Sequence, residues 1–221
     1  PYLPTPLGAL GMSGAPITNP APISIRTTEY DIDRSGLMGS LKWQLGAHAL
    51  EAGAWYEDNA FNQARRFYGL DRVTQGRDSL ELQKNPFFTQ WEYDFDTKTT
   101  MWYVQDTWDV TDQLTVFGGF KSLNVKNKAT PLVNTTFGGT IEASDDFLPQ
   151  IGGTFKLTPD HQLFLSYSEN MRAYQAAATS GPFSTSQLGF NTIKGSLKPE
   201  TSDTVEGGWR FRFGPLQGSL A

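Results

Sequence analysis

The sequence predicts an all-β fold, in which about eight antiparallel, up-and-down strands form part of the wall of a transmembrane β-barrel. Three observations predict this fold. Apolar and polar residues alternate along several segments, short turns join these segments in pairs, and long polar loops separate the pairs. Since successive side chains of a strand point to opposite faces, the resulting sheet has one apolar and one polar side.

The composition agrees with β-structure. The 221 residues include 13% aromatic residues, 22 Gly and 13 Pro, which favours strands and turns over helical bundles. No stretch of about 20 apolar residues occurs, so no transmembrane helix is predicted. The net charge of -5 and the pI near 5.0 argue against nucleic acid as a partner. The absence of cysteine excludes thiolate metal ligands and disulfides.

Four hairpins follow one another along the chain, each with a tight turn. Gly, Pro, Asp and Thr supply these turns, as they do between antiparallel strands. The hairpins are residues 28–57 with a turn at 45–48, 98–126 with a turn at 110–113, 146–172 with a turn at 158–161, and 202 onward with a turn at 214–217.

Alternation is clearest in the third and fourth hairpins. Phe155 and Phe211 belong to the apolar faces of their strands, whereas Thr154 belongs to a polar face. In a membrane barrel the apolar face contacts lipid and the polar face lines the lumen. The two apolar faces consist of Phe147, Pro149, Ile151, Gly153, Phe155 and Leu157, and of Val205, Gly207, Trp209, Phe211 and Phe213.

Alternation alone does not separate a membrane barrel from a soluble β-sandwich, because each covers one face of a sheet. The connections favour the barrel. Turns are short at one end, whereas the loops expected at the other end cover residues 58–97, 127–145 and 173–201. Aromatic residues towards the strand ends, such as Trp108 and Trp209, are typical of interfacial girdles. A soluble β-sandwich for binding or adhesion is the alternative of a different class.

The chain is expected to be an open fragment of a larger barrel. Its last strand has only residues 217–221, against the roughly 9–11 residues that span a bilayer. Residues 1–25 are uncharged and rich in proline, which indicates the remnant of an extracellular loop.

Several phrases of the sequence resemble the barrel wall of TonB-dependent receptors, and the resemblance covers most of residues 26–221. Their order, with hairpin turns between them, is more specific than any single phrase. They are Glu29-Tyr30-Asp31-Ile32-Asp33-Arg34-Ser35-Gly36-Leu37, His48-Ala49-Leu50-Glu51-Ala52-Gly53 with Trp55-Tyr56-Glu57, Tyr103-Val104-Gln105-Asp106-Thr107-Trp108, Leu148-Pro149-Gln150-Ile151-Gly152-Gly153, and Leu197-Lys198-Pro199-Glu200-Thr201-Ser202 with Glu206-Gly207-Gly208.

The resemblance implies a barrel of about 22 strands in the outer membrane of a Gram-negative bacterium, surrounded by lipid and lipopolysaccharide. It also implies an N-terminal plug domain inside the lumen, which the TonB complex displaces. The plug is expected to lie outside these residues. The expected function is import of a scarce ligand: an iron–siderophore complex, cobalamin or an oligosaccharide. A passive porin-like channel without a plug is the alternative that shares the same wall.

The loop expected at 58–97 carries the residues best suited to capture a ligand. Arginine forks bind carboxylates and phosphates bidentately, and aromatic rings stack on planar or sugar ligands. The loop therefore predicts an anionic small molecule, of unknown identity, at the barrel mouth. The alternative is a solvated loop whose arginines contact lipopolysaccharide phosphates. The candidate ligand-binding residues are Arg65, Arg66, Tyr68, Arg72 and Trp91, together with Arg172 at the top of the third hairpin.

No motif for catalysis, for a metal or for a cofactor is recognised, so an enzyme is not expected. His48 and His161 both fall in expected turns, and neither has a second histidine nearby with which to share a metal. Glu29, Asp31 and Asp33 recur at every second residue, which places them on one face of a strand. That face is expected to be the wet lumen.

Overall fold

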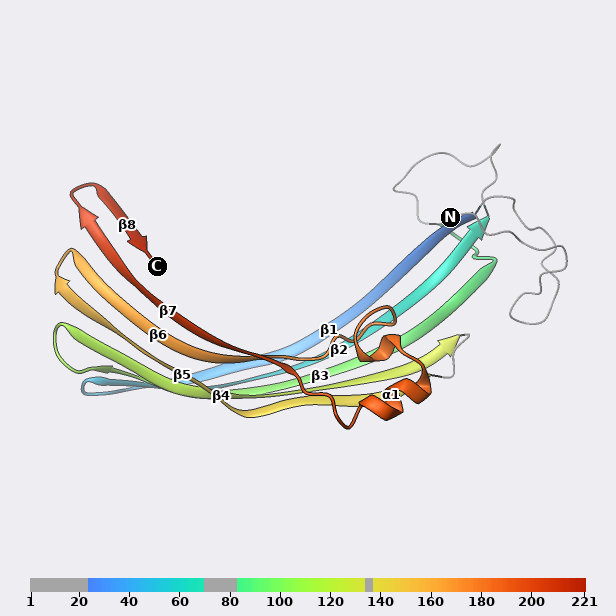
Figure 1. Cartoon of the computed structure of the whole chain (residues 1–221), viewed down its shortest axis with the longest axis horizontal. Helices are drawn as coiled ribbons and strands as arrows, with labels where there is room; N and C mark the ends of the chain where they lie inside the picture. Colours follow the sequence, from blue (N-terminus) through green and yellow to red (C-terminus); the bar gives the residue numbers. More distant parts are fainter. Residues whose placement is uncertain (1–23, 70–82, 134–136) are drawn as a thin grey trace.

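Eight strands lie in one antiparallel sheet, in which each strand pairs with its neighbour in the sequence (Figure 1). The computed structural model describes residues 24–69, 83–133 and 137–221. The up-and-down order confirms the predicted fold class, and the single sheet within these ranges is not the pair of packed sheets that forms a β-sandwich. The strands are β1 Ser24–Leu45, β2 His48–Gly69, β3 Phe88–Asp109, β4 Leu114–Val133, β5 Gly139–Thr158, β6 His161–Arg172, β7 Glu200–Phe213 and β8 Leu216–Leu220.

The first three strands are longer than a membrane is thick. β1, β2 and β3 each have 22 residues, so each rises roughly 70 Å along its axis. Even with a tilt of about 45°, such a strand exceeds the hydrocarbon core of a bilayer, which is about 30 Å thick. Figure 1 shows that the sheet curves along the length of its strands. Each of these strands is therefore longer than a membrane-spanning strand needs to be.

The four tight turns lie at one end of the sheet, as predicted. We call this the turn end and the opposite end the loop end. In the first turn Gly46 has a left-handed φ of 61°, which glycine adopts without strain. The four turns are residues 46–47, 110–113, 159–160 and 214–215.

Two of the loops predicted at the loop end are wrong in extent. β2 continues to Gly69 and β3 begins at Phe88, so most of the predicted loop 58–97 is strand. β4 and β5 leave only residues 134–138 between them, against the predicted 127–145. At the loop end the apolar residues of β3 lie on the lumen face and no longer on the outer face, so the alternation changes phase within the strand and its outer part was predicted as a loop.

The third long loop, residues 173–199, is confirmed and has structure of its own. It contains a 3-10 helix, η1 Pro182–Ser184, and an α-helix, α1 Gln187–Ile193, neither of which the sequence predicted. Within the described residues, no helix is long and apolar enough to cross a membrane. Residues 1–23 of the predicted loop remnant lie outside the described residues, and β1 begins at Ser24.

In the turn-end half of the sheet the two faces differ as the alternation predicts. One face, called here the lumen face, carries hydrogen-bonded polar side chains. Gln150 donates to Gln105 at 3.0 Å, and Tyr103 donates to Glu51 at 2.7 Å. The opposite face, called the outer face, carries exposed apolar side chains suited to lipid. The outer face includes Leu41, Trp43, Trp102, Val104, Ile151, Phe155, Leu163 and Leu165.

Candidate functional site

The loop at 173–199 folds back over the lumen face at the loop end, from β6 as far as β2 (Figure 1). Two amide side chains of the sheet hold it. Asn127 of β4 donates from Nδ2 to the Tyr174 carbonyl at 2.8 Å, and Gln63 of β2 accepts the Ala178 amide through Oε1 at 2.8 Å. Gln63 is 2% exposed and Asn127 is 1% exposed. Because both are buried, these hydrogen bonds offset the loss of their contacts with water.

An aromatic core lies between this loop and the sheet. Phe183 of η1 and Phe190 of α1 stack with ring centroids 5.5 Å apart, and Phe183 meets Phe95 of β3 edge-on at 5.7 Å. Phe190 is fully buried, and a Cβ at Gly139 would lie 2.3 Å from its ring, so glycine is required there. Burial of one phenylalanine contributes about 1.5–3 kcal/mol. This aromatic core therefore fixes the loop on the wall.

Beside the aromatic core, Arg65 of β2 and Trp91 of β3 form a direct cross-strand pair on the lumen face. The guanidinium carbon of Arg65 lies 5.0 Å from the centre of the Trp91 ring, and Trp91 packs against the core. Among the described residues Arg65 forms no ion pair, and its buried Nε has no hydrogen-bond partner. The pair presents an aromatic surface and a cation that no carboxylate of the described residues compensates, at the loop end of the lumen wall.

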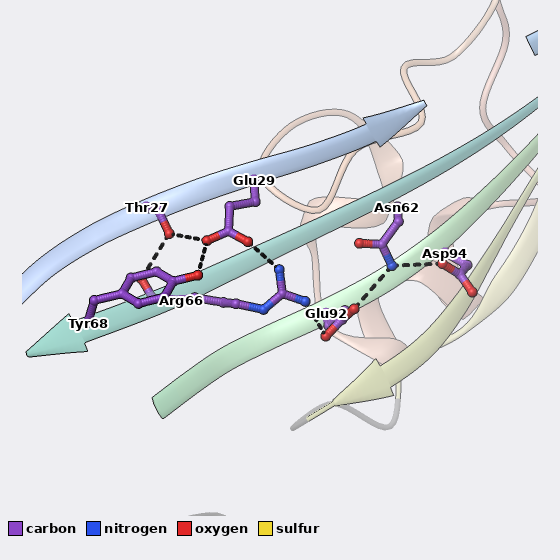
Figure 2. A network of polar contacts seen from close by, with 7 residues as sticks. All are labelled: Thr27, Glu29, Asn62, Arg66, Tyr68, Glu92 and Asp94. Carbon is purple, nitrogen blue, oxygen red and sulfur yellow. Dashed lines mark hydrogen bonds and ion pairs between the residues drawn. The ribbon is translucent and has the colours of Figure 1, made fainter. Parts of the chain in front are cut away.

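Arg66 and Tyr68 belong instead to a polar network on the outer face, beyond the apolar band (Figure 2). Arg66 forms ion pairs with Glu29 at 2.5 Å and with Glu92 at 2.9 Å. Tyr68 donates a hydrogen bond to Glu29 at 2.5 Å. We call this the outer network; it comprises Thr27, Glu29, Asn62, Arg66, Tyr68, Glu92 and Asp94.

Glu29 is the centre of the outer network. Partial burial raises the pKa of Glu29, but hydrogen bonds from Tyr68, Thr27 and Arg66 outweigh burial and hold the pKa below its ordinary value. Burial and the hydrogen bond to Glu29 raise the pKa of Tyr68 to about 12. At neutral pH the carboxyl is therefore ionised and the phenol is protonated, as the donor–acceptor pattern requires. The charge of Arg66 is already compensated by two carboxylates.

The strand structure divides the predicted ligand-binding cluster. Arg65, Arg66 and Tyr68 lie in β2 and not in a loop. Trp91 lies in β3. Because adjacent residues of a strand face opposite sides, the structure brings Arg65 and Trp91 together and turns Arg66 and Tyr68 away from the lumen. Arg72 lies outside the described residues.

Other residues singled out in the sequence make local contacts. Arg172 ends β6 and forms an ion pair with Glu200 of β7 at 3.6 Å, with both side chains exposed. His48 Nδ1 lies 2.7 Å from a carboxylate oxygen of Asp106, and the ring of His161 stacks on a tryptophan. In the part of the chain that the structure describes, no three His, Cys, Asp or Glu side chains gather as a metal site.

The carboxylates of β1 were expected to line the lumen, but they lie on the outer face. The register with β2 places Glu29, Asp31 and Asp33 on the same face as Leu41, which is the outer face. The expectation was wrong because it assumed that a charged face is always the lumen. Beyond the membrane the outer face is also wet, so charges are stable on it.

The aromatic core and its two amide anchors were not predicted from the sequence. One signal was present: Phe183 and Phe190 stand in the uncharged segment 173–193, and aromatic side chains of that size are usually buried. Gln63 and Asn127 stand among other polar residues in their strands, so nothing in the sequence distinguishes them.

The sequence matches the family described as TonB dependent receptor-like, β-barrel, over residues 8–221. The chain belongs to the TonB-dependent receptor β-barrel family. This membership confirms the resemblance in the sequence. No curated protein matches the chain.

Solved structures of transport receptors share the fold. The ferric citrate transporter FecA in its unliganded form has a TM-score of 0.58 and 18% identity, covering 86% of this chain and 26% of FecA. The ferric yersiniabactin uptake receptor FyuA from Yersinia pestis has a TM-score of 0.52 and 16% identity, and the match covers 86% of this chain and 27% of FyuA. The siderophore receptor PiuA from Acinetobacter baumannii has a TM-score of 0.53 and 16% identity, and the match covers 86% of this chain and 30% of PiuA. The chain spans less than a third of each, and these identities show the fold alone. The family and its structural neighbours are transport receptors, not enzymes.

Proposed function

We propose that the full-length protein is an outer-membrane receptor that imports an anionic iron–siderophore complex through a plugged, TonB-energised barrel. The family membership supports the barrel and its coupling to TonB. The names of the neighbours support the ligand class, since one refers to ferric citrate and another to ferric yersiniabactin. Cobalamin and oligosaccharides, the other predicted classes, are outcomes of the binding test below.

In this proposal the turn-end half of the wall lies in the membrane and the loop-end half lies outside it. The outer face of the turn-end half, with Trp102 and Ile151, contacts lipid in the outer membrane of a Gram-negative bacterium. The outer network lies beyond this band, at the level of the lipopolysaccharide sugars and phosphates. An N-terminal plug of the same protein fills the lumen, and the TonB complex acts on that plug.

The pair of Arg65 and Trp91 is the observation that carries the proposed ligand class. Arg65 has no carboxylate partner in the described chain and is held against an aromatic ring beside a fixed loop. A guanidinium in this setting offers a planar fork of N–H donors to carboxylate, hydroxamate or catecholate oxygens. The indole beside it offers a surface on which a flat chelate can stack. Arg72 and Arg172 stay predictions for the same ligand.

The test compares Arg65→Ala with Arg66→Ala in the full-length receptor, using ferric citrate, a ferric hydroxamate, a ferric catecholate, cyanocobalamin and a maltooligosaccharide as probes. Loss of a hydrogen bond to a charged group costs about 1.5–3 kcal/mol, so Arg65→Ala should weaken binding of the ferric chelate roughly 10–100-fold. Arg66→Ala removes the same side chain from the opposite face and should leave the Kd unchanged. Equal effects of the two variants, or binding of the neutral probes alone, would contradict the proposal.

A further inference from the structure

Three cationic side chains gather on the lumen face at the turn end, away from Arg65. Lys156 of β5 and Arg210 of β7 both pair with Gln162 of β6, and Arg212 lies on the same face of β7 as Arg210. Arg65 is near the other end of β2, so roughly 50 Å of strand separates the two regions. The three cations line a hollow of about 480 Å³ beside the turn between β5 and β6, and its other lining residues include Asp160, Gln162, Gln217 and also the apolar Phe211.

The cations of this hollow are not compensated by the wall itself. No ion pair links Lys156, Arg210 or Arg212 to a carboxylate of the described chain. By contrast, Lys42, at the turn end of β1 on the same face, forms an ion pair with Glu51 at 3.3 Å. Three like charges around one hollow produce a positive potential that concentrates anions there.

Contacts within the wall orient part of this cationic group. The guanidinium carbon of Arg210 lies 4.6 Å from the centre of the Phe164 ring, and its Nη1 donates to Gln162 at 3.3 Å. The Lys156 ammonium lies 3.5 Å from a backbone carbonyl of the turn between β3 and β4. Asp160 lines the hollow but forms no ion pair with the cations; its backbone carbonyl accepts the amide of Arg212 at 2.8 Å. These two contacts restrain the exposed guanidinium of Arg210 and leave its remaining N–H donors available to a ligand.

We propose that this hollow is a second anion site on the transport path, which binds the carboxylate or phosphate groups of a small polyanion. Its volume lies within the range of about 300–1,000 Å³ typical of small-molecule sites. Arg210 and Arg212 supply forks that match planar carboxylates, and Lys156 supplies a third positive charge. The inference rests on the proposed function, because it takes the imported chelate to be anionic and to leave along this wall.

The test is anion binding by the full-length receptor in detergent, measured by equilibrium dialysis with iron-free citrate and with inorganic phosphate. Arg210→Gln/Arg212→Gln should weaken citrate binding at one site by about 10-fold or more, since it removes both forks. Arg210→Lys/Arg212→Lys keeps the charge and should retain most of the binding, which separates loss of the site from misfolding. Lys126→Gln/Lys128→Gln removes two exposed lysines from the outer face of β4 and should change nothing.

Uptake gives an independent readout of the second site. At saturating ferric chelate, Arg210→Gln/Arg212→Gln should slow uptake several-fold while the Kd at the barrel mouth stays the same. Unchanged anion binding in this variant overturns the inference. It is also overturned if the wild-type receptor binds no anion other than at the site proposed at Arg65 and Trp91. If Arg65→Ala leaves chelate binding unchanged but the double variant still loses a phosphate site, the proposed function fails and the second site stands.

Discussion

The turn-end and loop-end halves of the long strands present opposite chemistry on the same outer face. In β3, Trp102, Val104 and Trp108 occupy the outer face at the turn end, whereas Glu92 and Asp94 occupy it at the loop end. The turn-end residues are exposed apolar groups that suit lipid. The loop-end residues belong to the outer network. One strand therefore carries two kinds of surface on its outer face, and under the proposed function the change between them marks the expected edge of the lipid contact.

The lumen face changes in the opposite sense. In β3, Tyr103 and Gln105 are polar and hydrogen-bonded at the turn end, whereas Tyr93 and Phe95 are buried against the folded loop at the loop end. The apolar stripe of the strand thus passes from the outer face to the lumen face near Lys98. At the loop end the wall is therefore stabilised by its own loop on the lumen face, whereas at the turn end its apolar side chains stay exposed on the outer face.

The largest effect should come from emptying the aromatic core at the loop end. Phe190→Ala removes a fully buried ring, which costs about 3–5 kcal/mol. We expect amide exchange across residues 173–199 to accelerate strongly in the full-length receptor while the turn-end halves keep their protection. Leu188→Ala, on the same helix but 78% exposed, is the matched control and should leave exchange unchanged. Equal exchange in both variants would mean that the loop is not held by its core.

The turn-end half of this comparison was predictable from the sequence, and the loop-end half was not. Four tight turns and the two faces of β5 follow from local residue patterns, because lipid and lumen impose a period of two. At the loop end the stripe changes face, so the continuing strand was taken for a loop. The contact of Phe95 with Phe183 joins residues far apart in the sequence, and no local pattern reports it.

The next effect tests the lipid contact of the turn-end half. Phe155→Lys places a charge on the outer face four residues before the turn at 159–160, and its cost should lie below the roughly 2–4 kcal/mol of a lysine at the bilayer midplane. Thr154→Lys places the same charge at the neighbouring residue, which lies on the lumen face of β5. We expect only the first variant to impair assembly of the full-length barrel, measured by the heat-modifiable shift in gel mobility. If the sheet tolerates Lys equally on both faces, the assignment of outer and lumen faces is wrong.

A smaller effect is expected from the amide anchors of the loop. Asn127→Leu leaves the Tyr174 carbonyl and the Thr97 hydroxyl without their buried partner, which costs about 1–3 kcal/mol. Asn124→Leu, which removes an exposed hydrogen bond to Glu142 on the outer face of β4, is the control. Exchange of the amides around Tyr174 should accelerate only in the first variant. Acceleration in both would indicate a general weakening of β4.

The candidate site was predicted in part. Arg65 and Trp91 were singled out by residue type, since arginine and tryptophan near a barrel mouth suit an anionic, planar ligand. The separation of Arg65 from Arg66 depends on which face each residue takes, and that requires the pairing with β3. Because residues 58–97 were predicted as a loop, no pairing between β2 and β3 was expected there. Residue type therefore located the region, and only the register selected the side chains within it.

The smallest effect concerns the outer network and its dependence on pH. The pKa of Glu29 is lowered in the folded protein, so its stabilising contribution is complete above the ordinary carboxyl pKa and is lost as the pH falls through the lowered value. Glu29 and Arg66 are partly exposed, and solvent screening limits the contribution to about 1 kcal/mol or less. We expect amide exchange at the loop end of β1 to accelerate, relative to the turn end, when the pH is lowered below the ordinary carboxyl range.

Glu29→Gln isolates this titration from all others, because the amide keeps the shape of the carboxyl but carries no proton equilibrium in this range. The variant should exchange faster than the wild type at neutral pH and should lose the additional acceleration at low pH. Since Glu29 lies on the outer face, its loss should leave the Kd for the chelate at Arg65 unchanged. An acid-dependent Kd that disappears in Glu29→Gln would instead couple the two faces across β2, and the division between Arg65 and Arg66 would no longer hold.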